Sequence, residues 1–153
     1  MMRSIHEVVR EVTHTADMTP AAGAMSAADE ASRGLGVEPL EHGEGTATLR
    51  MTVTPAMVNG HGIVHGGCVF LLADSAFACA CNSHGPATVA AGARHHLRGS
   101  AHEGDVLVAR AGERTRYGRS GLYDVTVLRG EKVIAEFRGR SRSIRGTTSK
   151  ESG

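Results

Sequence analysis

The sequence predicts a single α+β domain in which one apolar helix is wrapped by a curved antiparallel sheet. Residues 67–82 are almost entirely apolar, and they are too few to cross a membrane, which takes roughly 20 residues. The segments around them alternate polar and apolar residues with a period of two, as half-buried strands do. At 153 residues the chain is long enough for one core. A helix that is apolar on nearly every side needs a sheet that curls around it.

The N-terminal part of the chain is expected to lie outside this domain. Residues 1–24 form an extension, predicted to be partly disordered, because Pro and Gly interrupt its helical pattern. Ser26 is predicted to cap a short helix that a glycine closes. The domain then spans residues 25–146, and residues 147–153 form a polar tail.

Strand character begins at Gly36. Residues 44–54 alternate, and Pro55 ends the segment after an apolar face made of Ala47, Leu49, Met51 and Val53. A loop rich in Gly and His leads into the predicted helix, which Gly85 and Pro86 stop.

Three or four strands are expected after the helix, among them residues 105–116, 121–128 and 132–144. The last one sets Val133, Ala135 and Phe137 against Ile134, Glu136 and Arg138. Arg129-Gly130 is predicted to form a short hairpin link before it.

The cysteines indicate a reducing environment. There are three, an odd number, and they all fall in one apolar stretch, at Cys68, Cys79 and Cys81. They match no disulfide framework and no zinc ribbon, so we expect buried, reduced thiols in a cytoplasmic protein.

Charge is distributed unevenly along the chain. Residues 1–93 hold 4 basic and 9 acidic side chains, whereas residues 94–145 hold 12 basic and 6 acidic ones. A basic second half can serve an anionic ligand. Most of these arginines, however, are explained as the solvated face of amphipathic strands.

Asp74 is the exceptional residue of the predicted helix. An ionised carboxylate among apolar side chains costs several kcal/mol unless it is paired or hydrogen-bonded. A structural explanation is a carboxylate that caps a neighbouring loop or accepts from a buried amide. A catalytic role explains the position better, because perturbed ionisable groups concentrate at functional sites.

His65, Gly66 and Gly67 stand where the helix is expected to begin. Unpaired N–H groups and the positive end of the helix dipole gather at such a point, and glycine allows a ligand to approach closely. This is the geometry of an oxyanion site. By itself the motif could also be a plain Gly-rich turn.

The spacing of Gly66 and Asp74 predicts a dimer. They are eight positions apart, which is about 12 Å along a helix. A carbonyl polarised at Gly66 is therefore out of reach of Asp74 on the same helix. If both act in one reaction, they come from two chains.

No metal or cofactor is expected. His61 and His65 have a metal-like spacing, but they stand in a glycine-rich loop without an HExxH pattern or a CxxC pair, and His95-His96 has no further ligands. The chain has no Gly-x-Ser-x-Gly elbow and no phosphate loop, so nothing supports a serine hydrolase.

Residues 59–85 read NGHGIVHGGCVFLLADSAFACACNSHG. This stretch closely resembles the thioesterases of bacterial phenylacetic acid degradation, a branch of the hotdog superfamily. Their signature has an Asn, a short gap, His-Gly-Gly, then Leu-Ala-Asp-x-Ala-Phe-Ala and Cys-Asn-Ser. The likeness extends more loosely from about Ser26 to Gly146 and leaves residues 1–24 outside.

The resemblance implies a hotdog fold and an acyl-CoA hydrolase that acts on phenylacetyl-CoA or its ring-hydroxylated forms. In such enzymes the carboxylate matching Asp74 is general base or nucleophile, and the amide matching Gly66 polarises the thioester carbonyl. The side chains matching Asn59 and His65 hold that loop or position a water. The turn where relatives hold CoA is matched by Arg116, Gly118, Arg119, Ser120 and Gly121, whose guanidinium groups suit phosphate oxygens.

Two details depart from the family pattern. Residues 97–100 lack the proline that relatives usually have there, and no Ser or Thr near Ala90 matches the one that aids catalysis in some relatives. We expect a homo-oligomer, with shared-site dimers forming a tetramer, and no nucleic-acid or membrane partner.

Two other functions are weaker. A hotdog dehydratase needs a His base facing the acyl chain, whereas here the His precedes the helix. A non-catalytic acyl-CoA sensor would bring a DNA-binding module, and residues 1–24 are too short for one. A sensor would also have no use for Asp74.

Overall fold

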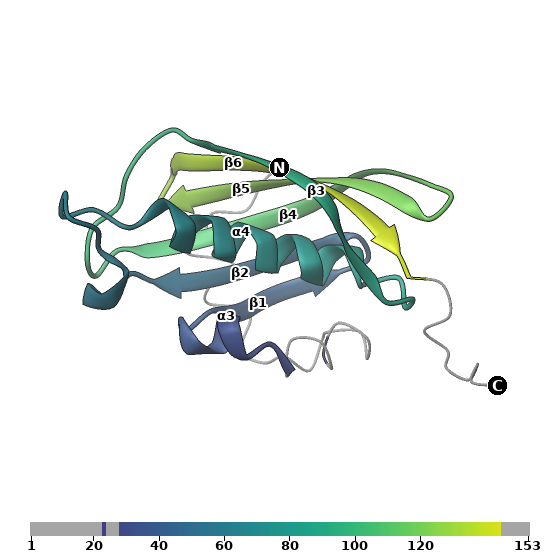
Figure 1. The fold of residues 1–153 in the computed structure, drawn as a ribbon, viewed down its shortest axis with the longest axis horizontal. Coiled ribbons are helices and arrows are strands. Elements are labelled where there is room, and N and C mark those ends of the chain that lie inside the picture. The colour runs from purple at the N-terminus through teal and green to yellow at the C-terminus, as the bar shows by residue number, and fades with distance from the viewer. Residues whose placement is uncertain (1–22, 24–27, 145–153) are drawn as a thin grey trace.

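The computed structural model describes residue 23 and residues 28–144. Figure 1 shows one long helix lying across a single sheet. The elements, in chain order, are α3 (Glu30–Gly34), β1 (Glu38–Gly43), β2 (Thr46–Thr52), the 3₁₀ turn η2 (Pro55–Met57), α4 (Gly66–Cys81), β3 (Thr88–Leu97), β4 (Val106–Tyr117), β5 (Ser120–Arg129) and β6 (Lys132–Ser143).

The six strands form one sheet in the order β1-β2-β4-β5-β6-β3, and every neighbouring pair is antiparallel. The core lies between this sheet and α4 (Figure 1). It is mainly aliphatic, with Phe77 of α4 packed against Tyr123 and Phe137 at ring-centroid distances of 5.6 and 5.7 Å. The prediction of an α+β domain with one central helix and an antiparallel sheet is confirmed.

The apolar face predicted for residues 44–54 is buried, and Pro55 begins η2 three positions after Thr52, the last residue of β2. The hairpin predicted at Arg129-Gly130 is also present, with Gly130 at a φ of 61°. The alternation predicted for the last strand is wrong at Ile134, which is fully buried instead of facing outward with Glu136. The pairing register of β5 and β6 shifts between Val127 and Leu128, and this irregularity turns Ile134 inward.

Helix α4 is not buried on nearly every side, which corrects the prediction from its composition. Its residues are buried where they face the sheet, but one stripe remains open. The stripe follows helical spacing and consists of Gly67, Phe70, Leu71, Asp74 and Ala78. We call it the open stripe. One chain supplies a sheet on one side of the helix only, so the opposite side stays uncovered in the described part of the chain.

Among the strands after the helix, β3 is the one for which the sequence pattern predicted no bounds. It lies at the edge of the sheet, paired with β6 alone, and nearly all of its residues are exposed. Val89 and Leu97 are 48% and 50% exposed although both are large and apolar. Since both faces of β3 look outward, no alternation of polar and apolar residues marks it.

The short helix α3 begins one residue after Asp29, whose side chain accepts a hydrogen bond from the Ser32 amide at 3.0 Å. Asp29 is therefore its N-cap, in place of the predicted Ser26, which lies outside the described residues. The predicted extension (apart from residue 23) and tail also lie outside them. Among the described helices, none is long and apolar enough to cross a membrane.

Candidate active site

The loop before α4 is held by Asn59. Its side-chain oxygen accepts hydrogen bonds from the amides of His61 and Ile63 at 2.9 and 3.4 Å, and its backbone amide donates to the Ile63 carbonyl at 2.8 Å. These bonds fold residues 59–63 into a closed turn that leads to His65. Asn59 thus sets the path of the chain into the helix.

His65 is the N-cap of α4. Its Nδ1 accepts a hydrogen bond from the Gly67 amide at 2.9 Å. Because Nδ1 accepts, the N–H of the ring is on Nε2. The imidazole therefore accepts the hydrogen bond of the Gly67 amide, one of the two glycine amides at the helix start, and keeps an N–H of its own.

The Gly66 amide is the free donor of the site. Gly66 is the first residue of α4, where an N–H has no partner within the helix. Within the described residues no acceptor takes this N–H, while the amides of Cys68 and Val69 both donate to the His65 carbonyl. A Cβ placed on Gly66 would meet only the Leu97 side chain of β3. A single N–H is thus left for a ligand at the positive end of the helix.

Asp74 lies two turns further along, on the open stripe. It is half-buried, and no donor in the described chain pairs with its carboxylate. Burial raises the pKa of Asp74 above its usual range, and the negative charge of Asp29 on α3 raises it further. The result is a carboxylate that is more basic than usual and open on one side.

The predicted CoA turn lies at the other end of α4. It is the two-residue hairpin between β4 and β5, with Gly118 at a φ of 58°. A cavity of about 340 Å³ lies beside it, between the turn and the end of the helix. The cavity is lined by Arg116, Gly118, Arg119 and Ser120 together with Cys81, His84, Pro86, Thr88, Tyr123, Ser141 and Ser143. Gly121 is absent from this lining, and a Cβ added to it would meet the side chains of Ser141 and Tyr123.

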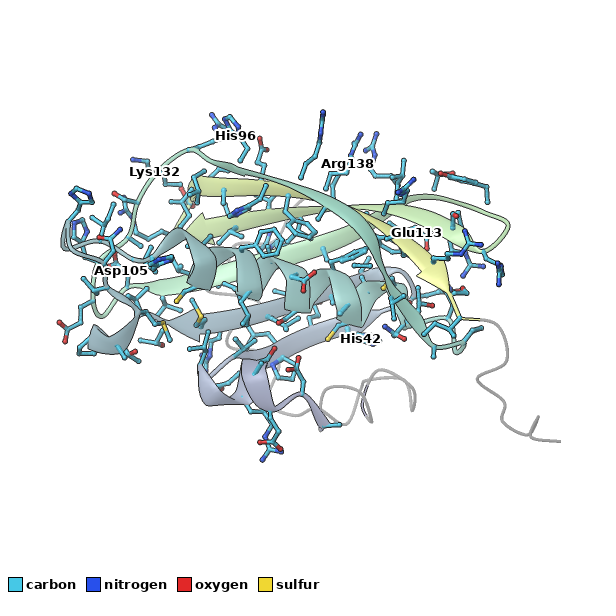
Figure 2. The ribbon with its side chains drawn as sticks, in the orientation of Figure 1. His42, His96, Asp105, Glu113, Lys132 and Arg138 are labelled. Carbon is cyan, nitrogen blue, oxygen red and sulfur yellow. The ribbon has the colours of Figure 1, made fainter. Side chains whose placement is uncertain are left out.

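Three residues of this cavity region were missed by the sequence reasoning. Glu113 of β4, labelled in Figure 2, contacts both His84 Nε2 and the buried Tyr123 hydroxyl through its Oε1, at 2.7 and 2.8 Å. Burial would raise the pKa of Glu113, but the hydrogen bonds from His84 and Tyr123, together with nearby positive charge that includes Arg116, outweigh it and hold the pKa below its usual range. The three residues come from a loop and two strands, so no local motif connects them.

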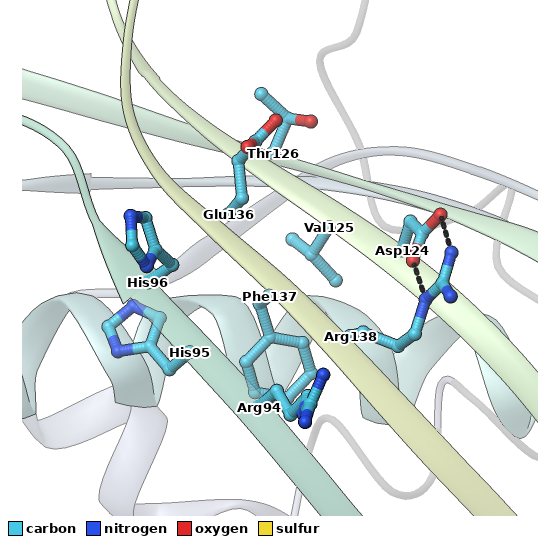
Figure 3. Close-up of a pocket in the computed structure, with 9 residues that line it drawn as sticks. All are labelled: Arg94, His95, His96, Asp124, Val125, Thr126, Glu136, Phe137 and Arg138. Carbon is cyan, nitrogen blue, oxygen red and sulfur yellow. Dashed lines mark hydrogen bonds and ion pairs between the residues drawn. The ribbon is translucent and has the colours of Figure 1, made fainter.

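A larger groove lies elsewhere, over β3, β5 and β6, with a volume of about 740 Å³. Its charges are largely paired. The Arg138 guanidinium donates to both oxygens of Asp124 at 2.6 and 3.0 Å (Figure 3). None of the predicted site residues lines it. In the part of the chain that the structure describes, no group of three or more His, Cys, Asp or Glu could hold a metal ion.

The structure therefore places the predicted residues in three groups. Asn59, His65 and Gly66 share the start of α4, Asp74 lies on its open stripe, and the arginine turn lies beyond its end. Gly66 and Asp74 are eight positions apart on one continuous helix, about 12 Å. One chain alone does not bring them together.

Comparison with known proteins decides the family. The family model "Thioesterase superfamily" matches residues 61–135. The acyl-coenzyme A thioesterase PaaI of Escherichia coli is 41% identical over 131 residues, which cover 85% of this chain and 94% of that protein. The chain belongs to the thioesterase superfamily. The enzyme class predicted from residues 59–85 is thereby confirmed.

Solved structures agree with this assignment. The structure of the E. coli PaaI protein, from the phenylacetic acid degradation operon, matches with a TM-score of 0.79, covering 81% of this chain and 91% of that one. A mutant of the phenylacetic acid degradation protein PaaI from Thermus thermophilus is 34% identical, with a TM-score of 0.74, covering 76% of this thioesterase and 100% of that chain. The predicted hotdog fold is confirmed.

Proposed function

We propose that this thioesterase hydrolyses phenylacetyl-CoA or a ring-hydroxylated phenylacetyl-CoA to the free acid and CoA, with Asp74 as general base or nucleophile. The observation that carries the proposal is the free Gly66 amide together with the unpaired Asp74 carboxylate. The acyl group is inferred from the relatives, whose names connect them with phenylacetic acid degradation.

The reaction follows from these two groups. The Gly66 N–H donates to the thioester oxygen and stabilises the negative charge that develops there. Asp74 either takes a proton from the attacking water or attacks the carbonyl itself, forming an anhydride that water then hydrolyses. On either route the C–S bond breaks, and the CoA thiolate leaves and takes up a proton. Asn59 and His65 keep the amide in place.

Each site is proposed to combine Gly66 of one chain with Asp74 of a second. Residue 70 is midway between residues 66 and 74, so a two-fold axis that sets Gly66 opposite the partner's Asp74 passes close to Phe70. Phe70 is 36% exposed on the open stripe, as expected of a side chain that a partner covers. The exposed edge of β3 supplies unpaired backbone groups for the same contact. Two such dimers are proposed to form the tetramer.

The cavity beside the arginine turn is proposed to hold the CoA moiety. Arg116 and Arg119 provide positive charge for its phosphates, and Ser120 provides a hydroxyl. Because these contacts are remote from the C–S bond, they act on substrate binding more than on turnover. Arg116→Ala and Arg119→Ala should raise KM for CoA esters about tenfold at similar kcat, and unchanged KM values would remove the turn from the site.

A cytoplasmic location remains our proposal. The three cysteines are free, and burial raises the pKa of Cys79 and Cys81 to about 12. Thiols with such a pKa stay protonated and unreactive, and they fit a reducing compartment.

A panel of acyl-CoA esters, read by release of free thiol, tests the activity and the acyl group. We expect the arylacetyl-CoA esters to have the highest kcat/KM, with straight-chain and branched esters as controls. Equal rates across the panel would refute the proposed acyl specificity. An absence of thiol release from every ester would refute the activity.

Mixed dimers test the shared site. Gly66→Pro removes the N–H while keeping a residue that helices accept at their first position, and His65 already has the extended backbone, φ −66° and ψ 132°, that precedes proline. Gly66→Ala is the matched control, because it adds a Cβ but keeps the N–H. Mixing Gly66→Pro chains with Asp74→Asn chains should restore one intact site per heterodimer. Verified heterodimers without activity would contradict the proposal.

A further inference from the structure

Two buried serines connect α3 to the helix that carries Asp74. Ser32 and Ser75 are each 7% exposed, and their hydroxyl oxygens are 2.6 Å apart. Ser75 directly follows Asp74, and its hydroxyl proton is shared between the Ser32 oxygen and the Leu71 carbonyl, which is 2.8 Å away, because Ser32 gives its own proton to Asp29. The contact therefore fixes α3 to the turn of α4 from which Asp74 projects.

The same serine holds Asp29. The Ser32 hydroxyl donates to one carboxylate oxygen of Asp29 at 2.6 Å, and the Ser32 amide donates to the other at 3.0 Å. The Asp29 carboxylate is thus fixed from both sides at the start of α3. A surface aspartate that served only as a helix cap would need the amide contact alone.

We propose that Asp29 is a positioning residue for the thioesterase reaction, held by the Ser32–Ser75 contact so that its negative charge acts on Asp74. The inference rests on the proposed role of Asp74 as base or nucleophile. A like charge nearby disfavours the ionised carboxylate and makes it a stronger base. General-base catalysis is most efficient when the pKa of the base approaches the working pH.

Other charged or titratable groups around α4 act elsewhere. Burial comes first and the negative charge of Asp29 second among the causes that raise the pKa of Asp74. His42 on β1 contacts the Cys79 carbonyl at 3.2 Å (Figure 2), His95 on β3 packs on Phe70, and Tyr123 on β5 is bonded to Glu113 on β4. The strands β2 and β6 present apolar or small side chains to the helix.

The remaining titratable or charged groups near Asp74 are Arg33 of α3, His65 at the helix start, and Cys79 and Cys81 of α4.

The test is the pH profile of kcat/KM for Asp29→Asn. Asparagine is a good N-cap, so α3 is kept while the charge is removed. The acidic limb of the profile should move to lower pH, because Asp74 then ionises more easily, and KM should stay near its wild-type value. Glu30→Gln is the matched control: it removes the same charge one residue away, from an exposed side chain that contacts Arg33. Its limb should not move. An unmoved limb in Asp29→Asn would overturn the inference.

A second variant, Ser32→Ala, and a direct titration of Asp74 test the inference independently of Asp29→Asn. Ser32→Ala keeps the charge but removes the hydroxyl that holds it, and should move the limb in the same direction. The titration of Asp74 can also be followed by carbon-13 NMR in protein labelled at aspartate Cγ, with Asp74→Asn for assignment. This titration needs no turnover. If the enzyme releases no thiol from any ester, the proposed function fails, while an unchanged Asp74 titration in Asp29→Asn refutes the inference alone.

Discussion

Helix α4 has an inner face that its own sheet covers and an open stripe that the described chain leaves uncovered. Leu72, Ala76 and Phe77 on the inner face are at most 1% exposed, whereas Phe70 on the open stripe is 36% exposed. Both sides are apolar in sequence, apart from Asp74 on the open stripe and Ser75 on the buried side. The inner face therefore stabilises one chain, and the open stripe is available for a second chain and for chemistry. Substitutions on the two sides should act on different measurable quantities.

The largest effect is expected from Asp74→Asn on the open stripe. Loss of the base or nucleophile should lower kcat by roughly 10²–10⁴-fold, the usual contribution of such a group. Folding, checked by circular dichroism, and CoA binding, checked by calorimetry, should persist. Near wild-type turnover would show that the open stripe is not the reacting face.

On the inner face, Phe77→Ala should destabilise the chain by about 3–5 kcal/mol. Phe77 contacts Tyr123 and Phe137, and its ring lies so close to Gly139 that a Cβ added there would meet it at 2.8 Å. Removing the ring would leave a cavity beside Gly139, which has no side chain to fill it. Urea unfolding measures the change. A loss below 1 kcal/mol would mean that the inner face is less tightly packed than its burial indicates.

Phe70→Ala is the same chemical change on the other side. It should weaken self-association by about 2 kcal/mol, or roughly 30-fold in the dissociation constant, because aromatic side chains at interface centres carry much of the binding energy. Sedimentation measurements over a dilution series give the dissociation constant, and specific activity should fall as the dimer dissociates. An unchanged dissociation constant would place the two-fold axis elsewhere.

The smallest effect is a change in stability caused by Asp74→Asn. This substitution should stabilise the fold, whereas the preceding changes lower activity, stability or self-association. The pKa of Asp74 is raised, mainly by burial, so ionising it costs folding free energy at neutral pH. This cost grows as pH rises through the raised pKa and vanishes below the ordinary aspartate pKa of about 3.9. Asp74→Asn should therefore melt at a higher temperature than wild type at pH 7, with the gap closing in acid. A gap independent of pH would argue against the raised pKa.

Much of the fold is determined by local sequence patterns. The alternation in residues 44–54 fixed β2, and the apolar run fixed α4 to within one residue. The residues of the helix start and Asp74 were also recognisable, because a glycine pair at a helix start and a carboxylate among apolar neighbours are chemical signals that need no partner.

Only the tertiary structure decided the rest. It showed that Ile134 turns inward at a register shift, that β3 is an exposed edge, and that α4 keeps an open stripe. The contact of Ser32 with Ser75 and the convergence of His84, Glu113 and Tyr123 join residues from separate elements. A residue's own neighbours in sequence fix its local conformation, but which face is covered and which polar groups meet depends on how distant segments pack. Sequence periodicity indicates which face of a single element is apolar, but it does not show which distant segment covers that face.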